Sequence, residues 1–179
     1  MPAVQNIYYV MKENTEMENL QSTPHIHNKL EYPPMHTAEH LLNQTMVRMF
    51  GCQRSENAHI ERRKSKISFI LGQEPTPQQV EEIVTRMQEL IRADLPVTYR
   101  MEPRANLTAE QQRRLPEGTD GEVRMVRIGD YDDCPCIGLH VEHTLQIGTF
   151  VLLGTNWDEE KHSFRIRFKL EGADSGTWG

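Results

Sequence analysis

The segment "KISFILGQEPTPQQVEEIVTRMQELI", from Lys66 to Ile91, places a short apolar stretch directly before a long amphipathic one. The apolar stretch contains β-branched and aromatic residues and is followed by Gly72, as is typical of a strand that ends in a turn. Thr76, Pro77 and Gln79 then supply an N-cap, a first-turn proline and the partner of a capping box. Apolar residues follow at helical spacing on one face. The segment therefore predicts a strand followed by a helix.

A second amphipathic helix is expected upstream, in "MHTAEHLLNQTMVRMFG" from Met35 to Gly51. Two prolines precede it at positions suited to the start of a helix, and its final glycine can end it. Its apolar residues recur at helical spacing and are Leu42, Met46, Met49 and Phe50. The first two turns of this helix carry two histidines.

The rest of the chain favours strands. "VTYRM" after Pro96 and the alternating apolar residues of "SFRIRFKL" (163–170) have the pattern of half-buried strands, as do Val123, Met125 and Ile128. "NLTAEQQRRL" predicts one more short helix, capped by Thr108. These elements predict an α+β fold with helices packed on one face of a largely antiparallel sheet.

The length of 179 residues, with 37% hydrophobic residues, suits one main domain. We divide the chain into an N-terminal extension (1–30) with a possible strand at Ile7–Val10, a main domain (31–171) and a loose tail (172–179). No apolar run of eighteen residues occurs, and the N-terminus lacks the basic start of a signal peptide. We therefore expect a cytoplasmic protein without membrane association.

The net charge and the cysteine content limit which ligands and partners the chain can be expected to bind. The formal net charge of -6 gives no overall attraction for nucleic acid, so an RNA contact requires a local basic patch. "ERRKSK" (61–66) is one candidate, and a solvated entry to the following strand is its alternative. The three cysteines, Cys52, Cys134 and Cys136, are too few and too uneven for a disulfide framework, which leaves thiols free for metal or chemistry.

Four residues form the most informative pattern. His36 and His40 lie four residues apart on the predicted helix, so their imidazoles project from one face. Cys136 and His140 repeat the same step, and Gly138 between them suggests a turn. One thiolate and three imidazoles form a ligand set suited to zinc. The alternative is that Cys136 is a small buried apolar residue and His140 an ordinary strand histidine.

The stretches "HTAEHLL" and "CIGLHVEHTLQIG" resemble the H-x-x-x-H and C-x-x-x-H motifs of the alanyl-tRNA synthetase editing domain. They are also similar to its free-standing AlaX-type relatives and to the second additional domain of threonyl-tRNA synthetase. The order of elements agrees over roughly residues 30–170. The resemblance implies that the chain removes a wrongly attached amino acid from the 3′ end of a mischarged tRNA, for example seryl-tRNA of the alanine system. It also implies a zinc site made by His36, His40, Cys136 and His140.

Two alternatives stay open beside this reading. In the threonyl relatives the same four positions act as polar groups without a metal, with a histidine as general base for water. The alanyl family usually has Cys-Gly-Gly-Thr-His in the second motif, whereas this chain has Ile137 and Leu139 in place of the first glycine and the threonine. That departure leaves room for a non-catalytic, zinc-stabilised module that binds tRNA or protein.

Residues within and beside the two motifs are further candidates for catalytic or metal-binding roles. Glu39 is a candidate catalytic proton carrier, with an exposed position on the helix surface as its alternative, and Thr37 is a candidate pocket hydroxyl. Cys134 could compete as a ligand, although the four-residue step to the histidine favours Cys136. His143 is expected on the opposite face of a strand from the metal site.

The acidic run before the second motif contains Asp130, Asp132 and Asp133. We expect this run to be a solvated loop rather than a second metal site.

Overall fold

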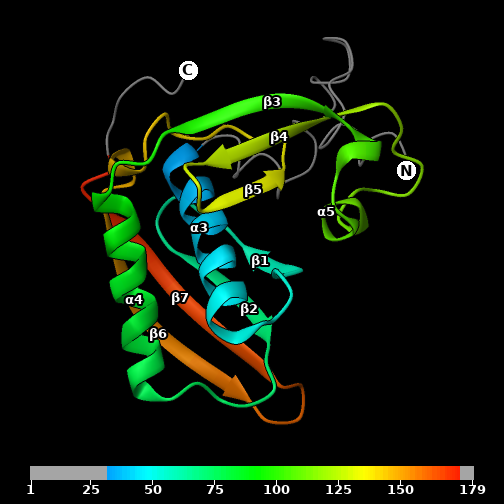
Figure 1. Ribbon diagram of the computed structural model, residues 1–179. Coiled ribbons are helices and arrows are strands. Elements are labelled where there is room, and N and C mark those ends of the chain that lie inside the picture. The colour runs from blue at the N-terminus through cyan, green and yellow to red at the C-terminus, as the bar shows by residue number, and fades with distance from the viewer. Residues whose placement is uncertain (1–31, 174–179) are drawn as a thin grey trace.

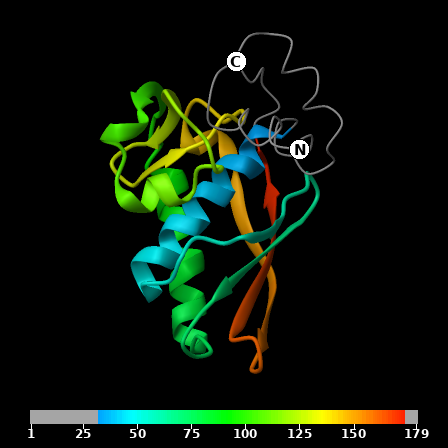
Figure 2. The same cartoon turned by 90° about the vertical axis from the view of Figure 1, so that its right-hand side faces the viewer.

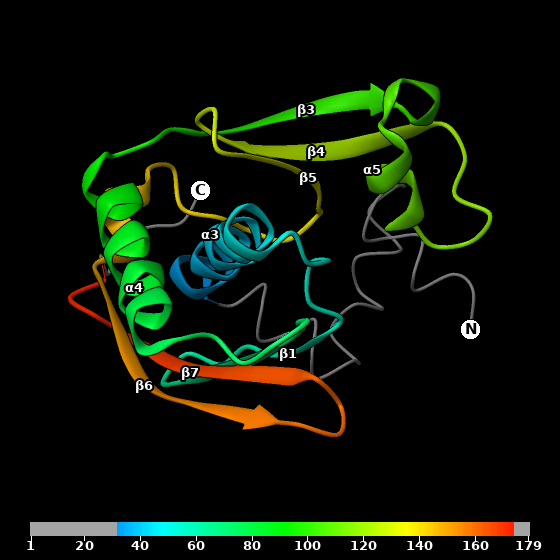
Figure 3. The same ribbon diagram turned by 60° about the horizontal axis from the view of Figure 1, so that its bottom comes forward.

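Residues 32–173, which the computed structural model describes, form two antiparallel sheets with one long helix between them (Figures 1 and 3). The elements are α3 (Pro33–Phe50), β1 (Asn57–His59), β2 (Ser65–Ile70), α4 (Pro77–Arg92), β3 (Val97–Pro103), η2 (Arg104–Asn106), α5 (Ala109–Arg113), β4 (Glu122–Ile128), β5 (Asp132–Pro135), η3 (Thr144–Ile147), β6 (Thr149–Asp158) and β7 (Ser163–Glu171). The elements labelled η are short 3₁₀ turns.

The larger sheet has the strand order β1-β2-β7-β6 and the smaller one the order β3-β4-β5. All strand pairs are antiparallel. The predicted α+β class is thus confirmed, but the antiparallel strands are divided between two sheets instead of forming one. The reason lies in α3, since every residue from 33 to 43 is buried. A helix buried on all sides needs cover from more than one layer.

The end of α3 and the start of α4 are as the sequence predicts, whereas α3 begins at Pro33 instead of after the two prolines. Pro33 opens α3, and Gly51 ends it in the left-handed conformation with φ of 64°, where a side chain would be strained. In α4, the Thr76 side chain accepts a hydrogen bond from the Gln79 amide, and the Gln79 side chain accepts one from the Thr76 amide. The apolar face of α4 packs into the core through Ile83, Met87 and Ile91.

The predicted strands are present as β2, β3, β4 and β7. On β7 the alternation buries Phe164, Ile166 and Phe168, and the ring of Phe168 stacks on Phe150 of β6 with centroids 5.0 Å apart. Three strands, β1, β5 and β6, were not predicted as separate elements. Figure 2 shows β6 and β7, in orange and red, running side by side to the right of α3.

The possible strand at Ile7–Val10 and most of the tail lie outside the described residues, so both stay predictions. Within 32–173, no helix has the length and apolar character required to cross a bilayer.

Candidate metal centre

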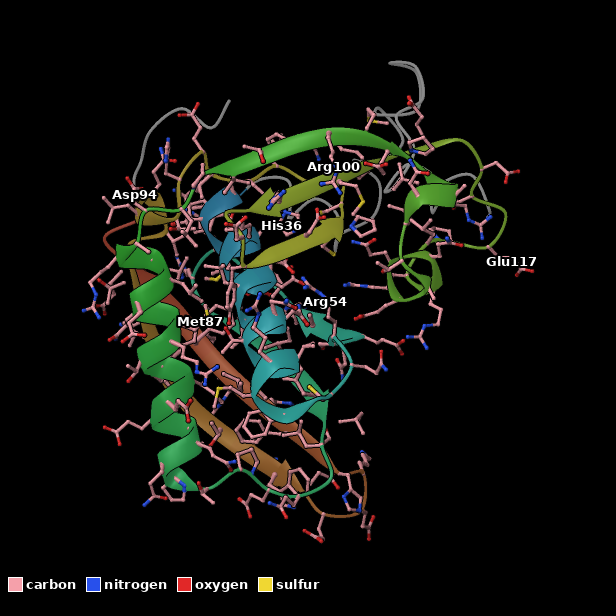
Figure 4. All side chains as sticks on the ribbon, viewed as in Figure 1. His36, Arg54, Met87, Asp94, Arg100 and Glu117 are labelled. Carbon is pink, nitrogen blue, oxygen red and sulfur yellow. The ribbon has the colours of Figure 1, made fainter. Side chains whose placement is uncertain are left out.

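The first turns of α3 carry one half of the predicted site. His36 and His40 are 3% and 6% exposed, and their rings meet edge to face with centroids 4.9 Å apart. Figure 4 shows His36 on α3, beneath the smaller sheet. Because the two side chains are one helical turn apart, α3 alone sets their spacing.

The other half lies in the loop between β5 and η3, not in a strand. β5 ends at Pro135, and the chain then runs from Cys136 to His140 outside any strand, although the amide of Cys136 still donates a hydrogen bond to the carbonyl of Arg124 on β4 at 3.1 Å. Gly138 lies against the His36 ring so closely that an added Cβ would be 2.2 Å from Cε1 of that ring. Only glycine permits this approach, which brings the loop onto α3.

The four predicted ligands meet at one point. One ligand atom from each of His36, His40, Cys136 and His140 lies within 4.8 Å of every other, and the Sγ of Cys136 is 3.4 Å from the Nε2 of His36. Zinc bonds of about 2.0–2.1 Å to nitrogen and about 2.3 Å to sulfur place tetrahedral ligand atoms roughly 3.3–3.6 Å apart. The separation of the Cys136 Sγ and the His36 Nε2 falls in this range, and the four residues together could hold a metal ion.

Each imidazole is oriented by an oxygen atom near its Nδ1. The Nδ1 of His36 donates a hydrogen bond to the carbonyl of Leu139 at 3.0 Å. The Nδ1 of His140 lies 3.0 Å from the hydroxyl of Thr37, and the Nδ1 of His40 lies 3.5 Å from a carboxylate oxygen of Asp132. This arrangement leaves Nε2 of each ring as the ligand atom, which is the usual way in which proteins hold metal-binding histidines.

Asp132 is not part of a solvated loop, and that prediction is wrong. It is 4% exposed, and its carboxylate accepts hydrogen bonds from Arg54 at 2.6 and 3.3 Å. Burial opposes the charge of Arg54, but the neighbouring Cys134 and Asp132 hold its pKa above the ordinary value. Its neighbours Asp130 and Asp133 are exposed, as expected. The pair of Arg54 and Asp132 therefore forms a buried ionic support behind His40.

Glu39 is buried rather than on the helix surface. It is 6% exposed, and its Oε2 lies 4.0 Å from the Nε2 of His36, so its carboxylate is beside the candidate metal position. Thr37 is fully buried; besides its contact with His140, its hydroxyl accepts a hydrogen bond from the amide of Val141 at 3.2 Å. Thr37 thus joins α3 to the loop that carries the other ligands.

Two competing residues lie outside the cluster. Cys134 is buried, and Arg114 donates a hydrogen bond to its sulfur at 3.2 Å, while burial raises the pKa of this thiol. His143 is half exposed and lies 3.8 Å from Asp94. His143 was expected on the opposite face of a strand from the site; this segment is not a strand, and His143 is not among the four clustered residues.

Two further residues at the site were not identified from the sequence. Arg124 of β4 donates hydrogen bonds to the carbonyls of Cys136 and Gly138, at 3.1 and 3.0 Å. Its guanidinium carbon lies 4.1 Å from the ring centroid of Tyr99 on β3. The only available signal was a charged residue between the buried positions Val123 and Met125, which does not reveal its partners.

Comparisons with known proteins agree with the motifs. Residues 123–167 match a family described as the threonyl and alanyl tRNA synthetase second additional domain. The chain is 31% identical over 122 residues to an alanine–tRNA ligase of Caldivirga maquilingensis and 31% identical over 126 residues to that of Halorubrum lacusprofundi. It is 26% identical over 144 residues to the alanyl-tRNA editing protein Aarsd1 of Danio rerio.

These alignments cover 64%, 67% and 76% of the chain, respectively. They cover only 14% and 13% of the two ligases and 34% of the editing protein. The chain thus spans about a third or less of the length of these relatives.

Proposed function

Because this chain is related to the editing-domain-like family of alanyl-tRNA synthetase, we propose that it is an aminoacyl-tRNA deacylase. It hydrolyses the ester that joins a wrongly attached amino acid to the 3′ end of a tRNA. The observation that carries this proposal is the meeting of His36 and His40 with Cys136 and His140, from segments about 100 residues apart, within 4.8 Å. Such convergence of one thiol and three imidazoles in buried surroundings is typical of a metal site.

We propose zinc as the metal, held by the Nε2 atoms of the three histidines and the Sγ of Cys136. When bound next to an ester, zinc can polarise the carbonyl and lower the pKa of a water molecule. A zinc ion with four protein ligands is normally structural, so catalysis requires that one ligand yield or that the coordination expand.

Glu39 is the proposed proton carrier. Its carboxylate lies beside His36, so it can accept a proton from the attacking water and later donate it to the ribose oxygen. The water oxygen forms a bond to the ester carbon, the bond from that carbon to the ribose oxygen breaks, and the proton reaches the leaving hydroxyl. Thr37 acts on this reaction indirectly, because its hydroxyl orients the ring of His140.

The proposed substrate is seryl-tRNA of the alanine system, and the proposed location is the cytoplasm, where tRNA is charged. The names of the relatives, alanine–tRNA ligase and alanyl-tRNA editing protein, support the alanine system. Leu139, which is 39% exposed beside the ligands, replaces a threonine that is usual in the family and therefore bears on the choice of amino acid.

Metal analysis and a deacylation assay on the same purified sample test the proposal. We expect close to one zinc per chain and release of serine from mischarged alanine tRNA, both lost in Cys136→Ser. The matched control is Cys52→Ser, since Cys52 is a free cysteine outside the cluster. His140→Ala should likewise lose zinc and activity, and His59→Ala is its matched control, because His59 lies outside the cluster.

Each other outcome has a definite meaning. Zinc without hydrolysis of any alanine-, serine- or threonine-system substrate would replace the enzyme with a zinc-stabilised binding module. Hydrolysis without zinc would instead support the metal-free mechanism in which a histidine is the general base.

A further inference from the structure

We propose that the ring of Tyr99 is a binding site for the terminal base of the RNA whose acyl ester lies in the metal centre. This inference rests on the proposed function, and it adds a specific contact to it. Tyr99 lies outside the two motifs that carry the proposed ligands. Its position, its exposure and its link to the metal-binding loop carry the inference.

Tyr99 lies on the face of the smaller sheet that is turned toward α3. In the register of β3 and β4, Tyr99 pairs with Val126 and Met101 pairs with Arg124, so these four side chains share one face. Val126 is fully buried in the main core, whereas Tyr99 and Met101 are 45% and 38% exposed. β3 is an edge strand of the smaller sheet. The result is an exposed apolar surface at the margin of the site.

Arg124 fixes this surface to the metal centre. Its guanidinium lies over the ring of Tyr99, 4.1 Å from the centroid, and the same group binds the carbonyls of Cys136 and Gly138. An aromatic ring held by an arginine is a suitable partner for a nucleobase, which stacks on aromatic and guanidinium planes.

The position agrees with the chemistry of the substrate. The ring centroid of Tyr99 is 6.5 Å from that of His140, a proposed ligand. In an aminoacyl-tRNA the acyl ester and the terminal base are attached to the same ribose, so the base must lie within one sugar of the ester. A stacking surface at this distance from the ligands can hold the base while the ester reaches the metal centre.

The probe is a short RNA ending in ACCA, with serine joined to its 3′ end through a stable amide, and an identical RNA that lacks the terminal base. Stacking of one base on an aromatic side chain corresponds to about a 5- to 150-fold difference in affinity. We expect wild-type protein to prefer the RNA with the base by such a factor. Tyr99→Ala should lose the preference, whereas Tyr99→Phe and Tyr99→Trp should retain it.

Thr98→Ala is the matched control. Thr98 is exposed and, as the residue before Tyr99 in β3, points to the opposite face of the sheet. Equal affinity of wild-type protein for both RNAs, or an unchanged preference in Tyr99→Ala, would overturn the inference. Failure of the proposed function has a different signature. In that case the protein does not release serine from tRNA, yet Tyr99→Ala still abolishes the preference for the terminal base.

Discussion

Gly138 shows how one residue can determine whether the two halves of the metal centre meet. The loop carries Cys136 and His140 and passes over the ring of His36 at a distance that leaves no room for a Cβ. The sequence indicated a turn at Gly138, but the reason for a glycine is steric contact with His36. The loop cannot move outward without separating the ligands.

Gly138→Ala should therefore lose zinc. We expect loss of most of the bound metal and of the deacylase activity, with a destabilisation of about 1–3 kcal/mol from overpacking. Elemental analysis and thermal unfolding measure the two effects. Gly72→Ala is the control, because no atom lies within 4 Å of its added Cβ. Full zinc content in Gly138→Ala would show that the loop does not need this close contact.

Asp132→Asn tests the ionic support behind His40. The substitution leaves the buried guanidinium of Arg54 without its carboxylate, and removing one partner of a buried pair costs about 3–5 kcal/mol. Urea unfolding measures this loss of stability. Metal titration measures the lower metal affinity that we expect when His40 is oriented less firmly. The neighbouring Asp133 pairs with Arg100 at the exposed surface, so Asp133→Asn should change stability by about 1 kcal/mol or less. Similar effects of the two substitutions would contradict a special role for Asp132.

At the scale of elements, Thr144 connects α4 with the segment that follows the metal-binding loop. Its hydroxyl donates to the carbonyl of Leu90 at 2.8 Å, with that of Ile91 at 3.3 Å, and accepts a hydrogen bond from the amide of Leu95 at 2.8 Å. One buried side chain thus satisfies backbone groups at the end of α4 and orients η3. The presence of a threonine at position 144 thus has a structural reason that is independent of catalysis.

Thr144→Val keeps the shape of this side chain but removes its hydroxyl. Because buried backbone groups would lose their partner, we expect a destabilisation of about 1–3 kcal/mol in urea unfolding. Deacylase activity below the unfolding transition should fall less than in the ligand variants. Thr155→Val, at an exposed position on β6, should have little effect. An unchanged free energy of unfolding in Thr144→Val would mean that water replaces the hydroxyl as a hydrogen-bond partner.

At the scale of the whole molecule, the metal centre joins two segments that only the fold brings together. The ligands come from α3, which lies between the sheets, and from the loop after β5. An unfolded chain cannot hold these four groups at one point, so zinc should bind the native state preferentially and stabilise it.

Removal of zinc should therefore lower the unfolding temperature, and added zinc should restore it. At a free zinc concentration 100 times the dissociation constant, the expected stabilisation is about 2.7 kcal/mol. Thermal unfolding with and without a chelator measures this difference, and Cys136→Ser should not respond to either treatment. Equal unfolding temperatures for the zinc-loaded and zinc-free wild-type protein would contradict a metal bound at this position.

The sequence alone determined the features that depend on neighbours along the chain. The capping box of α4, the glycine end of α3, the alternation of β7 and the spacing of His36 and His40 are local, because hydrogen bonds and side-chain directions repeat within one or two turns. The motifs also identified the four residues that meet at the site. The comparisons confirmed the resemblance that these motifs carried.

Only the tertiary structure decided which distant groups share a buried position. The division of the strands between two sheets, the burial of Glu39, the support of His40 by Asp132 and the contact of Arg124 with Tyr99 all join segments far apart in sequence. Asp132 and Glu39 look like surface residues in the sequence because charged side chains usually are. Glu39 is buried because it lies on α3, which runs between the two sheets. Asp132 is buried because the Arg54 guanidinium compensates its charge. Neither arrangement can be read from the residues that are neighbours in the sequence.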